Sequence, residues 1–262
     1  MKLGDMVLFP ADSGLWCRRF HPSPDATARL VCFPHAGGSA SFYFPVSSEL
    51  RDRVDVMAVQ YPGRQDRRAE PCVEDLGELA DAVFAALQGQ DDLPLTFFGH
   101  SMGALLAFEV ACRIERSGLK IERLFVSGRV GPAVVRPERL HILPDDDLLA
   151  AMAEMNGTDA RLLEDEEILR MALPALRSDL HAVETYRCDP GAGAVLNCPV
   201  TVLVGDTDPR TPLDEAREWH AHTSAGFDLE VFPGGHFFLS EQPTAVLALL
   251  DAHFAASQAE PE

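Results

Sequence analysis

The stretch LTFFGHSMGALLAF (residues 95–108) places Ser101 between two glycines, with apolar residues on both sides. The run LTFFG is typical of a buried strand, and MGALLAFEVACRIERSG (102–118) has the apolar periodicity of a helix. Glycines suit a sharp turn between them, because a Cβ atom there would collide with the neighbouring strand and helix. This context of G-x-S-x-G favours a nucleophilic serine. The alternative, which the pentapeptide alone does not exclude, is a small structural serine in a tight turn.

The alternation of strand and helix continues along the chain. Short β-branched or aromatic runs, typical of buried strands, lie at 15–20, 28–33, 54–60, 95–99, 123–128, 201–205 and 227–232. Helical patterns lie at 73–87, 102–118, 212–222 and 243–256. This order predicts an α/β fold with a mostly parallel central sheet and helices on both faces. We expect a single domain over 1–262, since α/β folds often reach this length as one unit.

Residues 136–188 break the alternation, because they carry helical patterns and no convincing strand. The pattern predicts one helix that stops at Asn156 and Gly157, and a second over EDEEILRMAL (164–173) that Pro174 interrupts. An insertion before the next strand would lie at the carboxyl end of the sheet, where open α/β folds bind ligands. We therefore predict a helical lid subdomain at about 136–188, with a packed excursion that gates nothing as the alternative.

The composition limits the classes of partner. Lys and Arg number 22 against 41 Asp and Glu, so the formal net charge is −19, which argues against binding nucleic acid or anionic membranes. No apolar run reaches the roughly 18 residues of a membrane span, and we expect a cytoplasmic protein. The six cysteines are dispersed and form no CxxC pair, which predicts reduced, mostly buried thiols and no metal site.

A serine nucleophile needs a base, and an acid that orients the base, and on this kind of fold they follow in the order Ser, Asp or Glu, His. His236 follows the last predicted strand and PGG, in a loop from which its ring can hang over the edge of the sheet. We therefore predict His236 as the base. The other histidines after the serine lie in the predicted lid or in helical patterns: His141, His181, His220, His222 and His253.

Two candidate acids follow the strand at 201–205, in the sequence GDTDP. Asp206 is well placed to accept hydrogen bonds from backbone amides of the turn, as short acids in loops often do. Asp208 lies further out, and we favour it as the acid. It precedes His236 by 28 residues, enough for one helix and one strand, so the two loops can meet. The strand before offers no acid until Glu138, which is a weak alternative.

An oxyanion hole needs two backbone N–H groups, one just after the nucleophile and one from the loop after an early strand. Met102 supplies the first, and we choose Ala36 in the glycine-rich loop FPHAGGSA (33–40) for the second. A nucleotide site is the rival for such a loop, but no Lys-Ser/Thr follows the glycines and no GxGxxG is present. His35 precedes the serine and lies on the wrong loop for a base, so we expect it to shape the turn or line the pocket.

Several motifs together resemble one family, the type II (editing) thioesterases of polyketide and nonribosomal peptide assembly lines, on the α/β-hydrolase fold. These are FPHAGGSA, YPGR, GHSMGALLAFEVA, LPALRSDLHAVETY, GDTDP and PGGHFFL, which together span nearly the whole chain. FPHAGGSA and LPALRSD are the more particular to this family. The resemblance implies a triad of Ser101, Asp208 and His236, with the amides of Ala36 and Met102 as the oxyanion hole.

The resemblance also implies the reaction and the partner. The family hydrolyses acyl thioesters on the phosphopantetheine arm of carrier proteins, clears aberrant acyl groups and requires no cofactor. Carrier proteins are acidic, so a chain of net charge −19 needs local bases to dock one. Arg64, Arg67 and Arg68 in YPGRQDRRAE (61–70) form the candidate docking cluster, with a solvated loop as the alternative.

Three other functions stay open on the sequence. A carboxylesterase or lipase acting on small free esters would use the same triad. A chain-releasing thioesterase would free a full-length product, although such enzymes are usually fused domains. A non-catalytic binding module usually loses part of the triad, and here every part is present. We expect the chain to act as a monomer.

Overall fold

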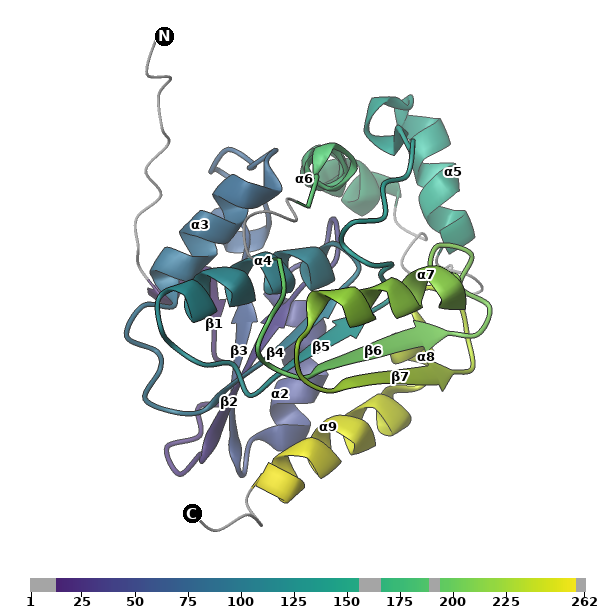
Figure 1. The fold of residues 1–262 in the computed structure, drawn as a ribbon. Coiled ribbons are helices and arrows are strands. Elements are labelled where there is room, and N and C mark those ends of the chain that lie inside the picture. The colour runs from purple at the N-terminus through teal and green to yellow at the C-terminus, as the bar shows by residue number, and fades with distance from the viewer. Residues whose placement is uncertain (1–12, 156–165, 189–193, 258–262) are drawn as a thin grey trace, which may run out of the picture.

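The computed structural model describes residues 13–155, 166–188 and 194–257, and within them one seven-stranded sheet forms the centre of the fold (Figure 1). The strand order is β1-β3-β2-β4-β5-β6-β7. β1 pairs antiparallel with β3, and the other strand pairs are parallel, as predicted. The strands are β1 (Cys17–Arg18), β2 (Ala28–Phe33), β3 (Val54–Val59), β4 (Leu95–His100), β5 (Arg123–Ser127), β6 (Val200–Gly205) and β7 (Phe227–Phe232).

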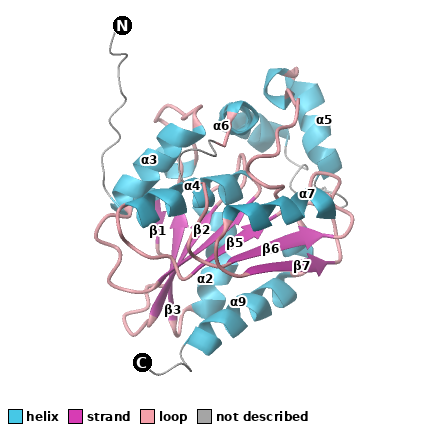
Figure 2. Cartoon of the chain, viewed as in Figure 1, coloured by secondary structure: helices cyan, strands magenta, loops and turns pink. Residues whose placement is uncertain are grey.

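Helices cover both faces of the sheet (Figure 2). α3, α4 and α7 lie on one face, and α2 and α9 lie on the other. Successive side chains of a strand point to opposite faces, so in β2 Val31 packs under α3 and α4 while Leu30 packs toward α2 and α9. The helices are α1 (Ser13–Trp16), α2 (Phe44–Leu50), α3 (Leu76–Ala86), α4 (Met102–Arg116), α5 (Asp145–Met155), α6 (Glu166–Thr185), α7 (Leu213–Arg217), α8 (Phe238–Glu241) and α9 (Pro243–Ser257).

Between β5 and β6 the described chain holds helices and no strand, in the region where the sequence predicts a lid. A 3₁₀ turn at Leu140–Ile142 precedes α5 and α6, which lie on the same side of the sheet as α3 and α4 (Figure 1). Buried Leu148 and Leu180 belong to a small apolar cluster of their own, and partly buried Ala36 packs against it. The two helices therefore rest on the loop that follows β2.

The predicted interruption at Pro174 is wrong, because α6 runs from Glu166 to Thr185 without a break. A proline inside a helix removes one backbone hydrogen bond, here the one to the carbonyl of Arg170. Pro174 is exposed, so that carbonyl lies on the solvent side, where water can replace the lost donor. Buried Leu173 and Ala175 hold the helix on both sides of the proline. The predicted stop at Asn156 and Gly157 lies outside the described residues.

Three smaller differences concern short elements. The strand expected at 15–20 is reduced to β1, which α1 precedes. The helix expected at 212–222 is split into α7 and a 3₁₀ turn at Glu218–His222, and α2 was not expected at all. These elements have too few residues for a periodic pattern to form in the sequence.

The six cysteines are reduced thiols, as predicted, and four of them are buried. Burial raises the pKa of the Cys17, Cys112 and Cys198 thiols to about 12 in each case. Burial also raises the pKa of half-buried Cys72, which lies against the loop after β3.

Candidate active site

Ser101 lies in the turn that joins β4 to α4, at the carboxyl edge of the sheet. Its backbone has φ 55° and ψ −114°, a strained conformation for a residue with a side chain. A Cβ at Gly99 would lie 2.2 Å from the carbonyl oxygen of Gly103, and a Cβ at Gly103 would lie 2.0 Å from that of Phe33. Both glycines are therefore required, and the sharp turn predicted from the sequence is present.

His236 lies in the loop after β7, and Asp208 lies in the loop after β6. His236 Nδ1 is 2.9 Å from Asp208 Oδ2, and both side chains are buried. Burial acts to raise the pKa of Asp208, but the hydrogen bond and charge of His236 and the N–H of Arg210 outweigh burial and lower the pKa. The N–H of Arg210 donates to Asp208 Oδ1 over 2.8 Å. An ionised Asp208 accepts a proton-bearing Nδ1 and leaves Nε2 of His236 facing outward as the base.

The ring of His236 lies beside the serine turn. Its centroid is 5.1 Å from that of His100, the residue before Ser101, and a Cβ at Gly128 would lie 3.4 Å from its Cε1 atom. Among the described residues, Ser101 Oγ makes no hydrogen bond to the ring. Such contacts are often long in a free enzyme and shorten when substrate binds. The structure thus brings the three predicted side chains to one edge of the sheet, but Ser101 and His236 are not hydrogen-bonded to each other.

The other aspartate of the loop after β6, Asp206, binds the backbone of the neighbouring loop. Its Oδ1 atom accepts a hydrogen bond of 3.0 Å from the N–H of Gly234, in the loop that leads to His236. The N–H of Thr207 donates to the carbonyl oxygen of Gly234 over 3.1 Å. Asp206 therefore has the role expected of it, and these bonds hold the acid loop against the base loop.

The two predicted oxyanion donors come from neighbouring loops. The close approach of Gly103 to Phe33 brings the start of α4 against the end of β2, so the loop with Ala36 lies beside Met102. Met102 is the first residue of α4, where an N–H has no partner within the helix. Among the described residues, neither Ala36 nor Met102 donates its N–H to a backbone carbonyl outside the helices and strands. Both donors are available to a substrate oxygen.

The glycine-rich loop is fixed by a carboxylate from α6. Asp179, which is 1% exposed, accepts a hydrogen bond of 2.7 Å from the N–H of Gly37, next to Ala36. It also binds Arg64 through two contacts, at 2.6 Å and 2.9 Å. Arg64 donates further to the carbonyl oxygen of Gly38 over 3.2 Å. We call Arg64 and Asp179 the clamp, because the pair joins the loops after β2 and β3 to the helical segment.

The clamp overturns the predicted docking cluster of three arginines. Burial acts to lower the pKa of Arg64, but the carboxylate of Asp179 outweighs burial and raises the pKa. Arg67 is 2% exposed, lies over the ring of Trp16 and binds Glu70 over 2.6 Å. Arg68 is exposed. Two of the three side chains therefore face the interior, and no three-arginine surface exists for an acidic partner.

Two buried imidazoles that the sequence did not single out as bases line the site. Burial, with smaller contributions from His236 and Arg64, lowers the pKa of His35 to about 3. Burial also lowers the pKa of His100, whose Nδ1 lies 3.0 Å from Ser127 Oγ. Both rings are neutral at neutral pH, and His35 packs against the ring of Phe237, which also contacts His236.

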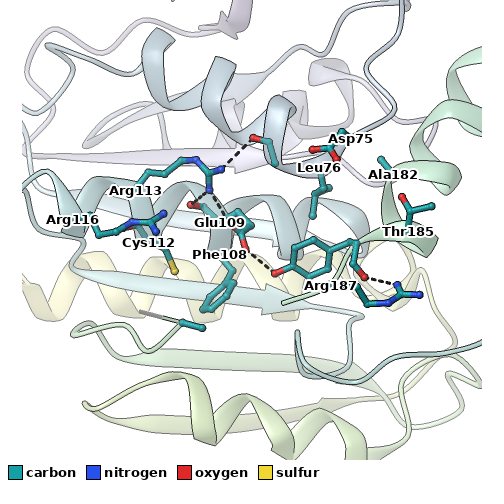
Figure 3. Close-up of a pocket in the computed structure, with 13 residues that line it drawn as sticks. Asp75, Leu76, Phe108, Glu109, Cys112, Arg113, Arg116, Ala182, Thr185 and Arg187 are labelled. Carbon is teal, nitrogen blue, oxygen red and sulfur yellow. Dashed lines mark hydrogen bonds and ion pairs between the residues drawn. The ribbon is translucent and has the colours of Figure 1, made fainter. Parts of the chain in front are cut away.

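A cavity of about 330 Å³ lies between α3, α4 and the end of α6, about two to four turns along α4 from Ser101 (Figure 3). In its wall, Arg113 binds Glu109 over 2.6 Å and also binds Asp81, which lies outside the lining, over 2.6 Å. The Tyr186 hydroxyl donates to Glu109 over 2.7 Å. The contact between Tyr186 and Glu109 ties the chain just after α6 to α4.

The described residues hold no group of three or more His, Cys, Asp or Glu side chains that could bind a metal ion. None of the described helices is long and apolar enough to cross a membrane.

Comparison with known proteins gives the family. The thioesterase domain family matches residues 28–254. A probable cadicidin biosynthesis thioesterase of Streptomyces griseus is 54% identical over 231 residues, 88% of this chain and 63% of that protein. Thioesterase PikA5 of Streptomyces venezuelae is 49% identical over 253 residues, 96% of this chain and 89% of that protein.

Solved structures agree with these sequences. The type II thioesterase BorB from the borrelidin biosynthetic cluster superposes with a TM-score of 0.87 at 47% identity, over 92% of this chain and 98% of that chain. The strained serine turn, the buried Asp208–His236 pair and the free amides beside them fit the same chemistry. The chain therefore belongs to the thioesterase family on the α/β-hydrolase fold, and it is a thioester hydrolase of the type II group of polyketide and nonribosomal peptide pathways.

Proposed function

We propose that this enzyme hydrolyses acyl thioesters on the phosphopantetheine arm of acyl or peptidyl carrier proteins, and so removes aberrant acyl groups from an assembly line. The observation that carries the proposal is the buried hydrogen bond between His236 and Asp208 beside the strained turn of Ser101. One relative is named a probable cadicidin biosynthesis thioesterase, and BorB comes from the borrelidin biosynthetic cluster, which supports a carrier-bound substrate. We expect a cytoplasmic monomer that needs no cofactor.

The proposed mechanism has an acyl-serine intermediate. His236 Nε2 takes the proton of Ser101, and the serine oxygen attacks the thioester carbonyl carbon. The amides of Ala36 and Met102 donate to the oxyanion, a contribution worth about a hundredfold or more in turnover per donor. The carbon–sulfur bond breaks, and the pantetheine sulfur takes the proton from His236. Water, deprotonated by His236, then attacks the acyl-serine and releases the acid.

The apolar cluster of α5 and α6 supports a role for this segment in holding the acyl chain. Partly buried Ala36, a proposed oxyanion donor, packs against Leu148, Leu173 and Leu180. An acyl group whose carbonyl oxygen rests on Ala36 would therefore lie close to these side chains. We propose that residues 136–188 act as a lid over the site.

The test compares the wild type with Ser101→Ala on acyl-carrier proteins, acyl-CoAs and nitrophenyl esters, with acyl loss followed by intact mass. Ser101→Ala should lose about three orders of magnitude or more in turnover. Ser117→Ala, at the other end of α4, is the matched control, because its hydroxyl bonds only the carbonyl oxygen of Ile114 within the helix. Equal activity of Ser101→Ala and the wild type would exclude the mechanism. A turnover of nitrophenyl esters far above that of carrier thioesters would favour a carboxylesterase.

A further inference from the structure

A second cavity, about 30 Å³ in volume, lies beside the loops that follow β5 and β6. These strands are neighbours, so both loops leave the same edge of the sheet that carries Ser101 and Asp208. The end of α6 forms the remaining wall. The charged side chains that line the cavity are Arg129, Arg136, Arg187, Arg210, Glu138 and Glu184. In a chain of net charge −19, this cavity has an excess of positive charge.

The guanidinium of Arg129 makes no ion pair or hydrogen bond with the described residues, although the nearby charge of Glu138 acts to raise its pKa. Its buried Nε–H group has no acceptor in the described part of the chain. Its backbone is held, because its carbonyl oxygen accepts the indole N–H of Trp219 over 2.9 Å. Arg129 is partly buried, and a cation that is partly removed from water without a hydrogen-bonded partner is costly, since such groups in proteins are normally paired.

The acids of the cavity are already engaged with other groups. Glu138 binds Arg210, and Arg136 binds Glu215 over 2.5 Å outside the cavity. Glu184 binds His141 and the N–H of Leu140, which lies 2.7 Å away. Burial, followed by the positive charge of Arg210, lowers the pKa of Arg129 to about 10, so the guanidinium remains protonated at neutral pH. The cavity therefore presents a cation and no available anion.

Arg129 is also close to the reacting groups. It directly follows Gly128, where a Cβ would lie 3.4 Å from Cε1 of His236. Arg210, which also lines the cavity, donates a hydrogen bond from its backbone N–H to Asp208. Two residues that line the cavity, Arg129 and Arg210, therefore have their backbones close to His236 and Asp208.

We propose that this cavity binds an oxyanion of the substrate, with the guanidinium of Arg129 as its main ligand. The inference rests on the proposed function, since it assigns a binding site to that same substrate. A volume near 30 Å³, about the share of one water molecule in the liquid, admits the oxygen atoms of an anion and excludes an acyl chain. The oxygen atoms can come from a carboxylate on the acyl group or from the phosphate of the pantetheine arm.

Four thioesters separate these sources: butyryl and succinyl groups, each on pantetheine and on phosphopantetheine. The two acyl groups have the same number of carbon atoms and differ in one carboxylate, and the two thiols differ in the phosphate alone. Arg129→Met should lower kcat/KM for the thioesters that bear the bound anion by about ten- to a hundredfold relative to butyryl-pantetheine, which bears neither. A defect that follows succinyl identifies the carboxylate, and one that follows phosphopantetheine identifies the phosphate.

Controls separate binding from folding. Arg129→Met should not lower Tm, because it removes a cation that has no partner among the described residues, and Arg129→Lys should recover part of the selectivity. Arg51→Met, at an exposed arginine near the opposite edge of the sheet, should leave the four-substrate ratios unchanged. Equal loss on all four thioesters, or no loss on any, would overturn the inference. If the wild type hydrolyses none of the four, the proposed function fails instead.

Discussion

Replacing Asp179 with alanine would leave the guanidinium of Arg64 buried without its carboxylate and the N–H of Gly37 without its acceptor. Removing one partner of a buried ion pair typically costs about 3–5 kcal/mol in unfolding free energy. For a chain of this size, about 2–4 °C of Tm is lost per kcal/mol, so we expect a decrease of about 6–20 °C. Because Gly37 adjoins Ala36, we also expect kcat to fall about a hundredfold, as when one oxyanion donor is lost.

The assay pairs thermal unfolding, followed by circular dichroism, with turnover of butyryl-N-acetylcysteamine at a temperature where every variant is folded. The double variant Arg64→Met/Asp179→Leu should recover much of the lost Tm, since it removes both charges. It should not recover kcat, because Gly37 still lacks its acceptor. Glu70→Ala is the matched control: its carboxylate binds Arg67 in the same loop, is 33% exposed and does not contact the glycine-rich loop.

Two results would refute this reasoning. If folded Asp179→Ala kept the wild-type kcat, the clamp would not position Ala36. If its Tm fell no further than that of Glu70→Ala, the buried pair would contribute no more than a half-exposed one.

The remaining predictions concern the serine turn, the triad and a buried imidazole. Gly103→Ala should lower the free energy of unfolding in urea by about 3 kcal/mol, because its Cβ would overlap the carbonyl oxygen of Phe33; Gly118→Ala, with φ 88° and open space around it, should cost about 1 kcal/mol. Asp208→Asn should keep Tm within a few degrees and lower kcat about ten-thousandfold, because Nδ1 of His236 loses its anionic acceptor; an unchanged kcat would assign the acid elsewhere. Burial, then the charge of Arg123, lowers the pKa of His253 to about 4, so the unfolded chain takes up the proton first and stability falls as the pH drops from about 6.5 toward 4. His253→Gln should lose stability less steeply over that range, by about 1 kcal/mol at pH 5 after allowance for the partly exposed ring; parallel curves would contradict the shift.

The three loops that carry the triad could be predicted from the sequence because each one directly follows a strand that the sequence pattern shows. Ser101 follows the buried apolar strand β4, and Asp208 and His236 follow β6 and β7, further along the same sheet. In a parallel sheet the carboxyl ends of strands share one edge, so the order along the chain gives proximity without knowledge of any distant contact. The preference for Asp208 over Asp206 agrees with the hydrogen bonds each one makes.

Contacts between residues that lie far apart along the chain could not be predicted from the sequence. Arg64 and Asp179 are 115 residues apart, and nothing in either local pattern shows that they pair. A run of arginines predicts a basic surface when the partners of the arginines are unknown. The predicted docking cluster was wrong because two of its three arginines are buried in ion pairs. Asp179 ends LPALRSD, a motif quoted for the resemblance, but its role follows only from its contact with Gly37.

The buried cysteines bear on the product of the proposed reaction. Hydrolysis of each carrier-bound acyl group would release a free pantetheine thiol beside the enzyme. Thiol–disulfide exchange begins from a thiolate, and the raised pKa values of Cys17, Cys112 and Cys198 keep these thiols protonated at neutral pH. We therefore expect the enzyme to remain unmodified at these three positions through many turnovers, even where carrier arms are partly oxidised to disulfides.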